Sequence, residues 1–69
     1  MKALSGKDLA RILELRGWQL LRVRGSHRVY GKPGARNRLV IPIHGNRSLK
    51  PGMLHDILKD AGLAESDLE

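Results

Sequence analysis

The chain has 69 residues, contains no cysteine and carries a formal net charge of +6. That length accommodates one small domain and excludes the larger folds that bind dinucleotide cofactors or enclose deep substrate pockets. The lack of cysteine excludes a disulfide framework and a thiolate zinc site. Because the sequence has neither the roughly 20 apolar residues that span a bilayer nor the apolar segment of a signal peptide, we expect a cytoplasmic protein without a membrane partner.

The first predicted element is a helix over about residues 6–16. Ser5 begins a short version of the capping box, and Leu4 and Leu9 stand where a hydrophobic staple would pack. Apolar residues then recur at helical spacing, and Gly17 supplies a C-terminal stop.

Three further runs have the length and composition of strands: residues 18–24, 26–30 and 39–43. The first alternates imperfectly, with Leu21 and Val23 on one face and Arg22 and Arg24 on the other. This pattern indicates a bulge near Leu20 and Leu21. The runs are joined by two segments of turn composition: Gly25-Ser26 and residues 32–37. Antiparallel pairing is therefore expected.

Pro42 places the third strand at a sheet edge, or turns its own nitrogen away from the hydrogen-bonded ladder. A turn centred near residues 33–37 puts His27 opposite Pro42 or Ile43. His44 then lies one diagonal step from His27 or on the opposite face, depending on a register that the sequence leaves open by one residue.

The second helix is predicted to begin at Pro51 and to end at Gly62, with Leu63 placed for a Schellman contact. Its apolar face is Met53, Leu54, Ile57, Leu58 and Ala61. The element order is therefore αβββα: an α+β fold in which a three-stranded antiparallel sheet carries both helices on one face. We expect one domain over 1–69, with frayed ends at 1–4 and 64–69.

Residues 15–55 hold nine basic groups and no carboxylate: Arg16, Arg22, Arg24, Arg28, Lys32, Arg36, Arg38, Arg47 and Lys50. A field of this size favours nucleic acid as the partner. The alternative is a solvated surface that only keeps the protein soluble. Arginine predominates, which favours bidentate binding of phosphate.

His27 is the leading candidate for acid–base chemistry. It follows the Gly25-Ser26 turn, begins a strand, lies among arginines, and has a side chain that exchanges protons near neutral pH. A surface histidine without a partner is the alternative. Ser26 as a nucleophile is disfavoured, because neighbouring strand residues point to opposite faces.

Two other histidines remain, and a metal site is not expected. His44 is either a second acid–base group or an RNA contact, and His55 is a residue of the helix surface. Three histidines without cysteine or a nearby carboxylate do not make a zinc or magnesium site.

Metal-free RNA cleavage suits such a chain, because the 2′-hydroxyl already lies beside the phosphate and the protein supplies proton transfer and positive charge.

Seven segments together resemble the HicA toxins, also called the YcfA-like family, over about residues 4–63. They are Ser5-Gly6-Lys7, Gly17-Trp18, Gly25-Ser26-His27-Arg28-Val29-Tyr30, Ile41-Pro42-Ile43-His44-Gly45-Asn46, Leu49-Lys50-Pro51-Gly52-Met53-Leu54, Ile57-Leu58 and Ala61-Gly62-Leu63. The resemblance implies a fold similar to a double-stranded-RNA-binding domain. It also implies an mRNA-cleaving toxin of a type II toxin–antitoxin module that a HicB antitoxin neutralises. The catalytic histidine of the family's glycine–serine–histidine motif falls on His27.

The resemblance thus implies a metal-independent endoribonuclease that needs no cofactor and has a single catalytic histidine, His27, which acts as base or acid. The residues expected to contact RNA are Arg22, Arg24, Arg28, Lys32, Ser26 and His44. An antitoxin would cover this basic face with an acidic surface. Two alternatives stay open: a non-catalytic RNA-binding module of the same fold, and a subunit whose basic face meets only an acidic protein.

Overall fold

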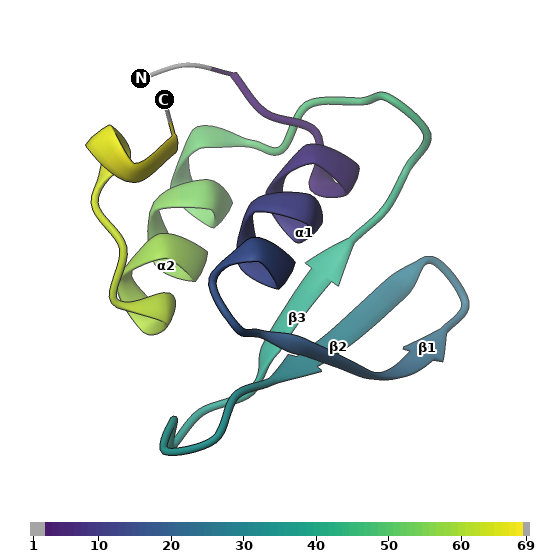
Figure 1. The fold of residues 1–69 in the computed structure, drawn as a ribbon. Helices are drawn as coiled ribbons and strands as arrows, with labels where there is room; N and C mark the ends of the chain where they lie inside the picture. Colours follow the sequence, from purple (N-terminus) through teal and green to yellow (C-terminus); the bar gives the residue numbers. More distant parts are fainter. Residues whose placement is uncertain (1–2, 69) are drawn as a thin grey trace.

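The computed structural model describes residues 3–68. Its elements are α1 (Gly6–Leu15), β1 (Gln19–Arg24), β2 (His27–Gly31), β3 (Leu39–Pro42), α2 (Pro51–Ala61) and the short 3-10 helix η1 (Glu65–Leu68). The strands form one antiparallel sheet in the order β1-β2-β3, and both α-helices lie on one face of it (Figure 1). The predicted αβββα order and α+β class are confirmed. Neither α-helix is long and apolar enough to cross a membrane.

The ends of α1 follow the local signals in the sequence. The Ser5 hydroxyl accepts a hydrogen bond from the Asp8 N–H at 3.1 Å, and Leu4 and Leu9 are both buried. Gly17 follows the last turn with a φ of 95°, a conformation that costs a residue with a side chain about 1–2 kcal/mol. The predicted cap, staple and stop are therefore confirmed.

The predicted Schellman end of α2 is also confirmed. Gly62 adopts a left-handed φ of 72°, and the Leu63 N–H donates to the Leu58 carbonyl at 2.9 Å. Met53 differs from the prediction. It was expected on the buried face, but 44% of it is exposed, whereas its neighbour Leu54 is buried.

A bulge adds Leu21 to β1, at the predicted place. The predicted sharing of one face by Leu21 and Val23 is wrong, because the extra residue reverses the alternation. Val23 faces Arg28, which shares the helix-covered side of β2 with the buried Tyr30. Leu21 instead lies over Gly31 on the open side of the sheet, with no helix above it.

The core lies between the helices and the sheet, and β1 contributes no side chain to it. Its buried members are Leu4, Leu9, Ala10, Leu13, Trp18, Tyr30, Leu39, Ile41, Leu54, Ile57, Leu58 and Leu68. Every residue of β1 is exposed. The helices thus cover β2 and β3, and leave β1 as an exposed edge.

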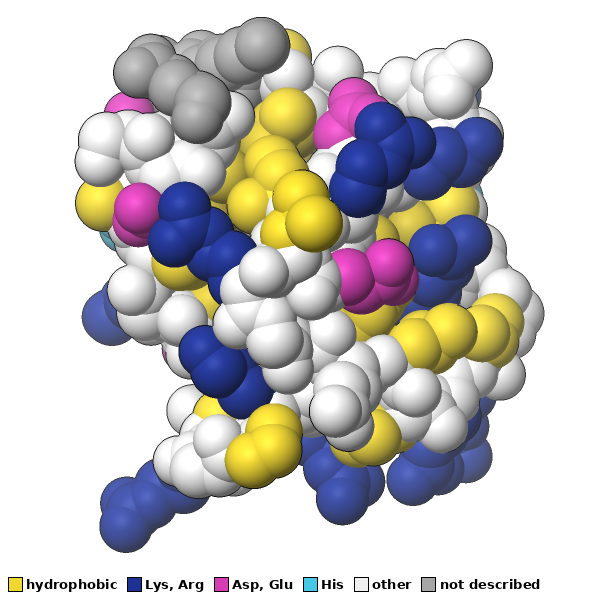
Figure 2. Space-filling view, in the orientation of Figure 1, with side chains coloured by type: hydrophobic (Ala, Val, Ile, Leu, Met, Phe, Trp, Pro, Cys, Tyr) yellow, Lys and Arg dark blue, Asp and Glu magenta, His cyan; other side chains and the backbone are white. Residues whose placement is uncertain are grey.

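Acidic and basic side chains are divided between the two layers. Within residues 3–68 every carboxylate side chain lies on a helix: Asp8, Glu14, Asp56, Asp60, Glu65 and Asp67. Most of the basic stretch lies on the sheet or in the loops that leave it: Arg22, Arg24, Arg28, Lys32, Arg36, Arg38, Arg47 and Lys50. In Figure 2 the carboxylates lie among the helices, and many Lys and Arg side chains gather toward the right margin and the lower end.

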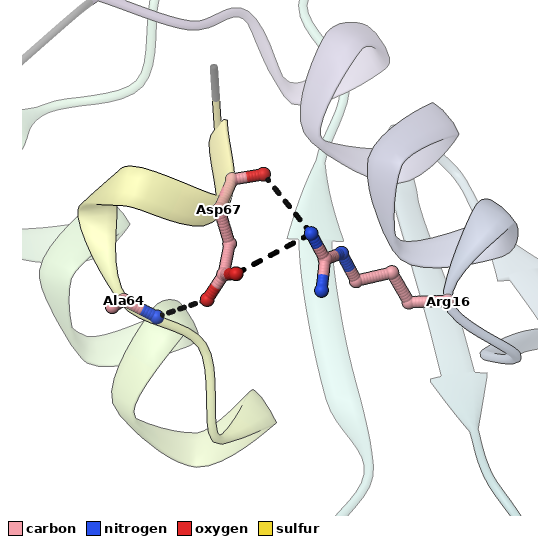
Figure 3. A network of polar contacts seen from close by, with 3 residues as sticks. All are labelled: Arg16, Ala64 and Asp67. Carbon is pink, nitrogen blue, oxygen red and sulfur yellow. Dashed lines mark hydrogen bonds and ion pairs between the residues drawn. The ribbon is translucent and has the colours of Figure 1, made fainter.

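The C-terminal segment, for which fraying is predicted from residue 64, contacts α1 in the structure. The Arg16 guanidinium lies 3.4 Å from both the carboxylate and the carbonyl oxygen of Asp67 (Figure 3). The Asp67 carboxylate accepts a hydrogen bond from the Ala64 N–H at 2.7 Å. Leu68 then enters the core, and at the other end Leu4 is buried too. Residues 1, 2 and 69 lie outside the described part of the chain.

Candidate active site

A two-residue hairpin turn holds His27 at the start of β2. Gly25 has a φ of 56° at the first turn position, as in the type II′ turns that match the twist of antiparallel strands. Arg24 and His27 face each other directly across this turn. Directly opposed residues project from the same side of a sheet. His27 and Arg24 therefore share the open side, which no helix covers.

The partner of His27 on β3 is Pro42, which confirms one of the two predicted registers. Pairing continues one step past β3, because the Ile43 N–H donates to the Ser26 carbonyl at 2.7 Å. Alternation then returns His44 to the side of Pro42 and His27. His44 becomes the diagonal neighbour of His27, at a Cα separation of about 7–8 Å in regular sheets.

The segment after β3 is tied to the beginning of the chain. The Leu49 N–H donates to the Leu4 carbonyl at 2.7 Å, and Ser48 forms a bridge with Ser5. These contacts bring the loop back toward the sheet before α2 begins. They place the loop cations Arg47 and Lys50 beside the histidines.

The outcome is a pocket of about 330 Å³ at this end of the molecule. Its lining residues are His27, Pro42, His44, Arg47, Ser48, Leu49, Lys50 and Met53. Lys50 caps α2 without a side-chain hydrogen bond to the helix. The pocket thus combines two imidazoles, which can transfer protons, with two cations, which can stabilise an anion. None of the lining residues that the structure describes is a carboxylate.

The remaining predicted contact residues do not line the His27 pocket and lie in different places. Arg22 faces Val29, so it lies on the open side with Arg24 and His27. Ser26 is exposed in the hairpin turn, beside the pocket. Lys32 lies at the far end of β2, where it lines a different pocket of about 350 Å³ formed largely by the β2–β3 loop.

Arg28 lies on the other side of the sheet from His27. It projects toward the helices near Tyr30, whose hydroxyl donates to the Glu14 carboxylate at 2.6 Å. Burial and this carboxylate raise the pKa of Tyr30, and the Arg28 guanidinium opposes the shift. Arg28 therefore belongs to a polar cluster that joins β2 to α1, and is not gathered with the His27 pocket.

Sequence reasoning assigned Arg47, Lys50 and Met53 no part in the site. All three line the His27 pocket. For Arg47 and Lys50 the available signal was their place in a loop that must cross from the sheet to the second helix, with Pro51 marking where that helix begins. Among residues 3–68, no group of three or more His, Asp or Glu side chains is arranged to hold a metal ion.

Comparison with known proteins identifies the family. The family model described as HicA toxin of bacterial toxin–antitoxin matches residues 6–63 of the 69-residue chain. Among curated proteins, no sequence matches the chain. The matched range begins with α1, ends just after α2 and contains the whole sheet and the His27 pocket. The chain therefore belongs to the HicA toxin family of bacterial toxin–antitoxin systems.

Proposed function

We propose that this toxin is a metal-independent endoribonuclease that cleaves mRNA, with His27 as its catalytic residue. The observation that supports this most directly is the pocket itself. It contains His27 together with the imidazole of His44 and the cations Arg47 and Lys50. It lies on a side of the sheet that is open to a large substrate.

RNA is the substrate that this set of groups suits. Its 2′-hydroxyl is held beside the phosphate by the ribose, so the protein need not bind a separate nucleophile. What remains is to move protons and to stabilise the negative charge that develops on the phosphate oxygens. His27 serves the first task, and Arg47 and Lys50 serve the second. DNA, which lacks the 2′-hydroxyl, would not react by this route.

The open side of the sheet would hold the RNA backbone. Arg24 lies directly opposite His27, and Arg22 follows on the same side. Ser26 and His44 flank the pocket, and Lys32 would contact a strand that continues toward the β2–β3 loop. Arg28 has its contacts on the helix side, so we assign it to the fold and not to the RNA contact.

The same basic face is the natural site for inhibition by a HicB-type antitoxin. Within residues 3–68 the carboxylate side chains lie on the helices, so the sheet and its loops present only positively charged side chains to a partner. An antitoxin with an acidic surface would dock here by charge complementarity and would exclude RNA from His27.

The test is cleavage of a mixed RNA by the purified wild-type protein, His27→Ala and His55→Ala, each with EDTA present. His55 is an exposed residue of α2 outside the His27 pocket, so its variant is a matched control. We expect cleavage by the wild type and by His55→Ala, and none by His27→Ala. Thermal unfolding of all three should coincide, because both histidines are exposed.

Two results would overturn the proposal. Equal cleavage by His27→Ala and the wild type would place catalysis elsewhere or in a contaminant. RNA binding by all three proteins without any cleavage would make the chain a non-catalytic RNA-binding module of the same fold.

A further inference from the structure

We infer that His44 is the second proton-transfer residue of this reaction, acting on the same phosphate as His27 from the other side. The inference rests on the proposed ribonuclease function and adds to it a catalytic residue. Cleavage by attack of a 2′-hydroxyl needs one group that accepts a proton and another that donates one. His27 alone leaves one of these tasks unassigned.

The geometry of the sheet supports the pairing. His27 faces Pro42, and the hydrogen bond from the Ile43 N–H to the Ser26 carbonyl continues the antiparallel pairing toward His44. The two histidines are thus diagonal neighbours on one side, and both line the same pocket of about 330 Å³. Two such side chains can flank a phosphate between them, each within about 3 Å of its own oxygen.

Neither imidazole is occupied by a structural task. Within residues 3–68 neither His27 nor His44 makes a side-chain hydrogen bond, and both are exposed. By contrast, the polar side chains that hold the fold together, such as Tyr30 and Asp67, have identified partners. Both imidazoles are therefore free to exchange protons with a bound substrate.

The chemical step balances with these two groups alone. One neutral imidazole accepts the proton of the 2′-hydroxyl as its oxygen bonds to phosphorus. The bond from phosphorus to the 5′-oxygen breaks, and the other imidazole, in its protonated form, gives its proton to that oxygen. The products are a 2′,3′-cyclic phosphate and a 5′-hydroxyl. The two imidazoles recover their starting forms by exchanging protons with water.

The first measurement separates proton transfer from RNA contact. Glutamine keeps hydrogen-bonding groups but cannot transfer a proton, so His44→Gln is compared with the wild type and with the control His55→Gln. We expect kcat to fall by roughly 10²–10⁴-fold in His44→Gln, with the control unchanged. An effect on KM alone, or no effect, would show that His44 only contacts RNA and would overturn the inference.

The second measurement uses an oligonucleotide whose scissile 5′-oxygen is replaced by sulfur. A thiolate leaves without being protonated, so the loss of the proton donor has little effect on this substrate. We expect only one of the two variants, His27→Gln or His44→Gln, to recover a rate near that of the wild type. Recovery of neither variant, or of both, would contradict the division of proton transfer between the two histidines.

The outcomes also distinguish this inference from the function on which it rests. A wild-type protein that does not cleave RNA, or a fully active His27→Gln, defeats the proposed function and the inference together. If the wild type is active, His27→Gln is inactive and His44→Gln is fully active, only the inference about His44 is defeated.

Discussion

Gly6 in the first turn of α1 lies directly against the backbone carbonyl of Pro42 at the end of β3. A Cβ atom at position 6 would overlap that carbonyl oxygen. Pro42 in turn faces His27 and lines its pocket. The start of the first helix is thus packed on the strand end that supports the candidate active site, and only glycine permits this approach.

Gly6→Ala should therefore destabilise the protein by about 1–3 kcal/mol, because the added methyl group pushes the start of α1 away from the Pro42 carbonyl at the end of β3. The displaced Pro42 should also lower the cleavage rate. Urea unfolding measures the first effect. Gly52→Ala is the matched control: Gly52 is also helical, and a Cβ there would meet nothing within 4 Å. It should stabilise by about 0.4–1 kcal/mol. Equal effects of the two substitutions would contradict the packing described.

Tyr30→Phe should lower stability at neutral pH by about 1 kcal/mol, through the loss of the hydrogen bond to Glu14. The pKa of Tyr30 is raised by burial and by that carboxylate, so the folded protein holds the phenolic proton more tightly than the unfolded chain. This stabilisation is complete below the ordinary tyrosine pKa near 10 and is lost as the pH rises above it.

The difference in unfolding free energy between the wild type and Tyr30→Phe should therefore shrink above pH 10. Chemical unfolding of both proteins between pH 7 and about 11 measures it. A difference that stays constant over this range would show that Tyr30 is not held in its protonated form by the fold.

Arg24→Gln and Arg28→Gln remove the same charge from opposite sides of the sheet. Because Arg24 shares the open side with His27 and Arg28 faces the helices, only Arg24→Gln should remove a phosphate contact. For Arg24→Gln, the slope of log K against log[salt], where K is the association constant for single-stranded RNA, should be smaller in magnitude by about 0.7. Arg28→Gln should keep the wild-type slope. Equal slopes for the two variants would mean that RNA does not follow the open side.

Leu68→Ala tests whether the C-terminal segment is part of the fold. Leu68 is 7% exposed and packs in the core, so its truncation should destabilise by about 2 kcal/mol. Leu15→Ala is the control, because Leu15 is 83% exposed and its loss should change stability by less than about 0.5 kcal/mol. If the C-terminus is frayed, Leu68→Ala should change the free energy of unfolding as little as Leu15→Ala does.

Features that depend on neighbouring residues could be predicted from the sequence. Ser5 and Gly17 bound the first helix because a cap or a left-handed glycine completes hydrogen bonds within one turn. Pro42 indicated an edge strand because it lacks the N–H that a central strand would need. The family resemblance rested on motifs of the same short range, and the match over residues 6–63 confirms it.

Contacts between distant segments could not be read in this way. The imperfect alternation of β1 predicted a bulge, but not that Arg28 would lie near Tyr30, whose hydroxyl donates a hydrogen bond to Glu14 of α1. The sequence also did not predict the contact between Arg16 and Asp67, which are 51 positions apart. In both cases a packing surface made by another element decides the outcome.

By itself, then, the sequence determined the helices, the hairpins, the excess of basic residues and the choice of His27 as the candidate catalytic residue. The tertiary structure decided which groups accompany it. Register put His44 diagonal to His27, and the bond between Leu49 and Leu4 brought Arg47 and Lys50 to the same pocket. The reason is physical: caps and turns close hydrogen bonds within a few residues, whereas the path of a loop is set by the surfaces that it joins.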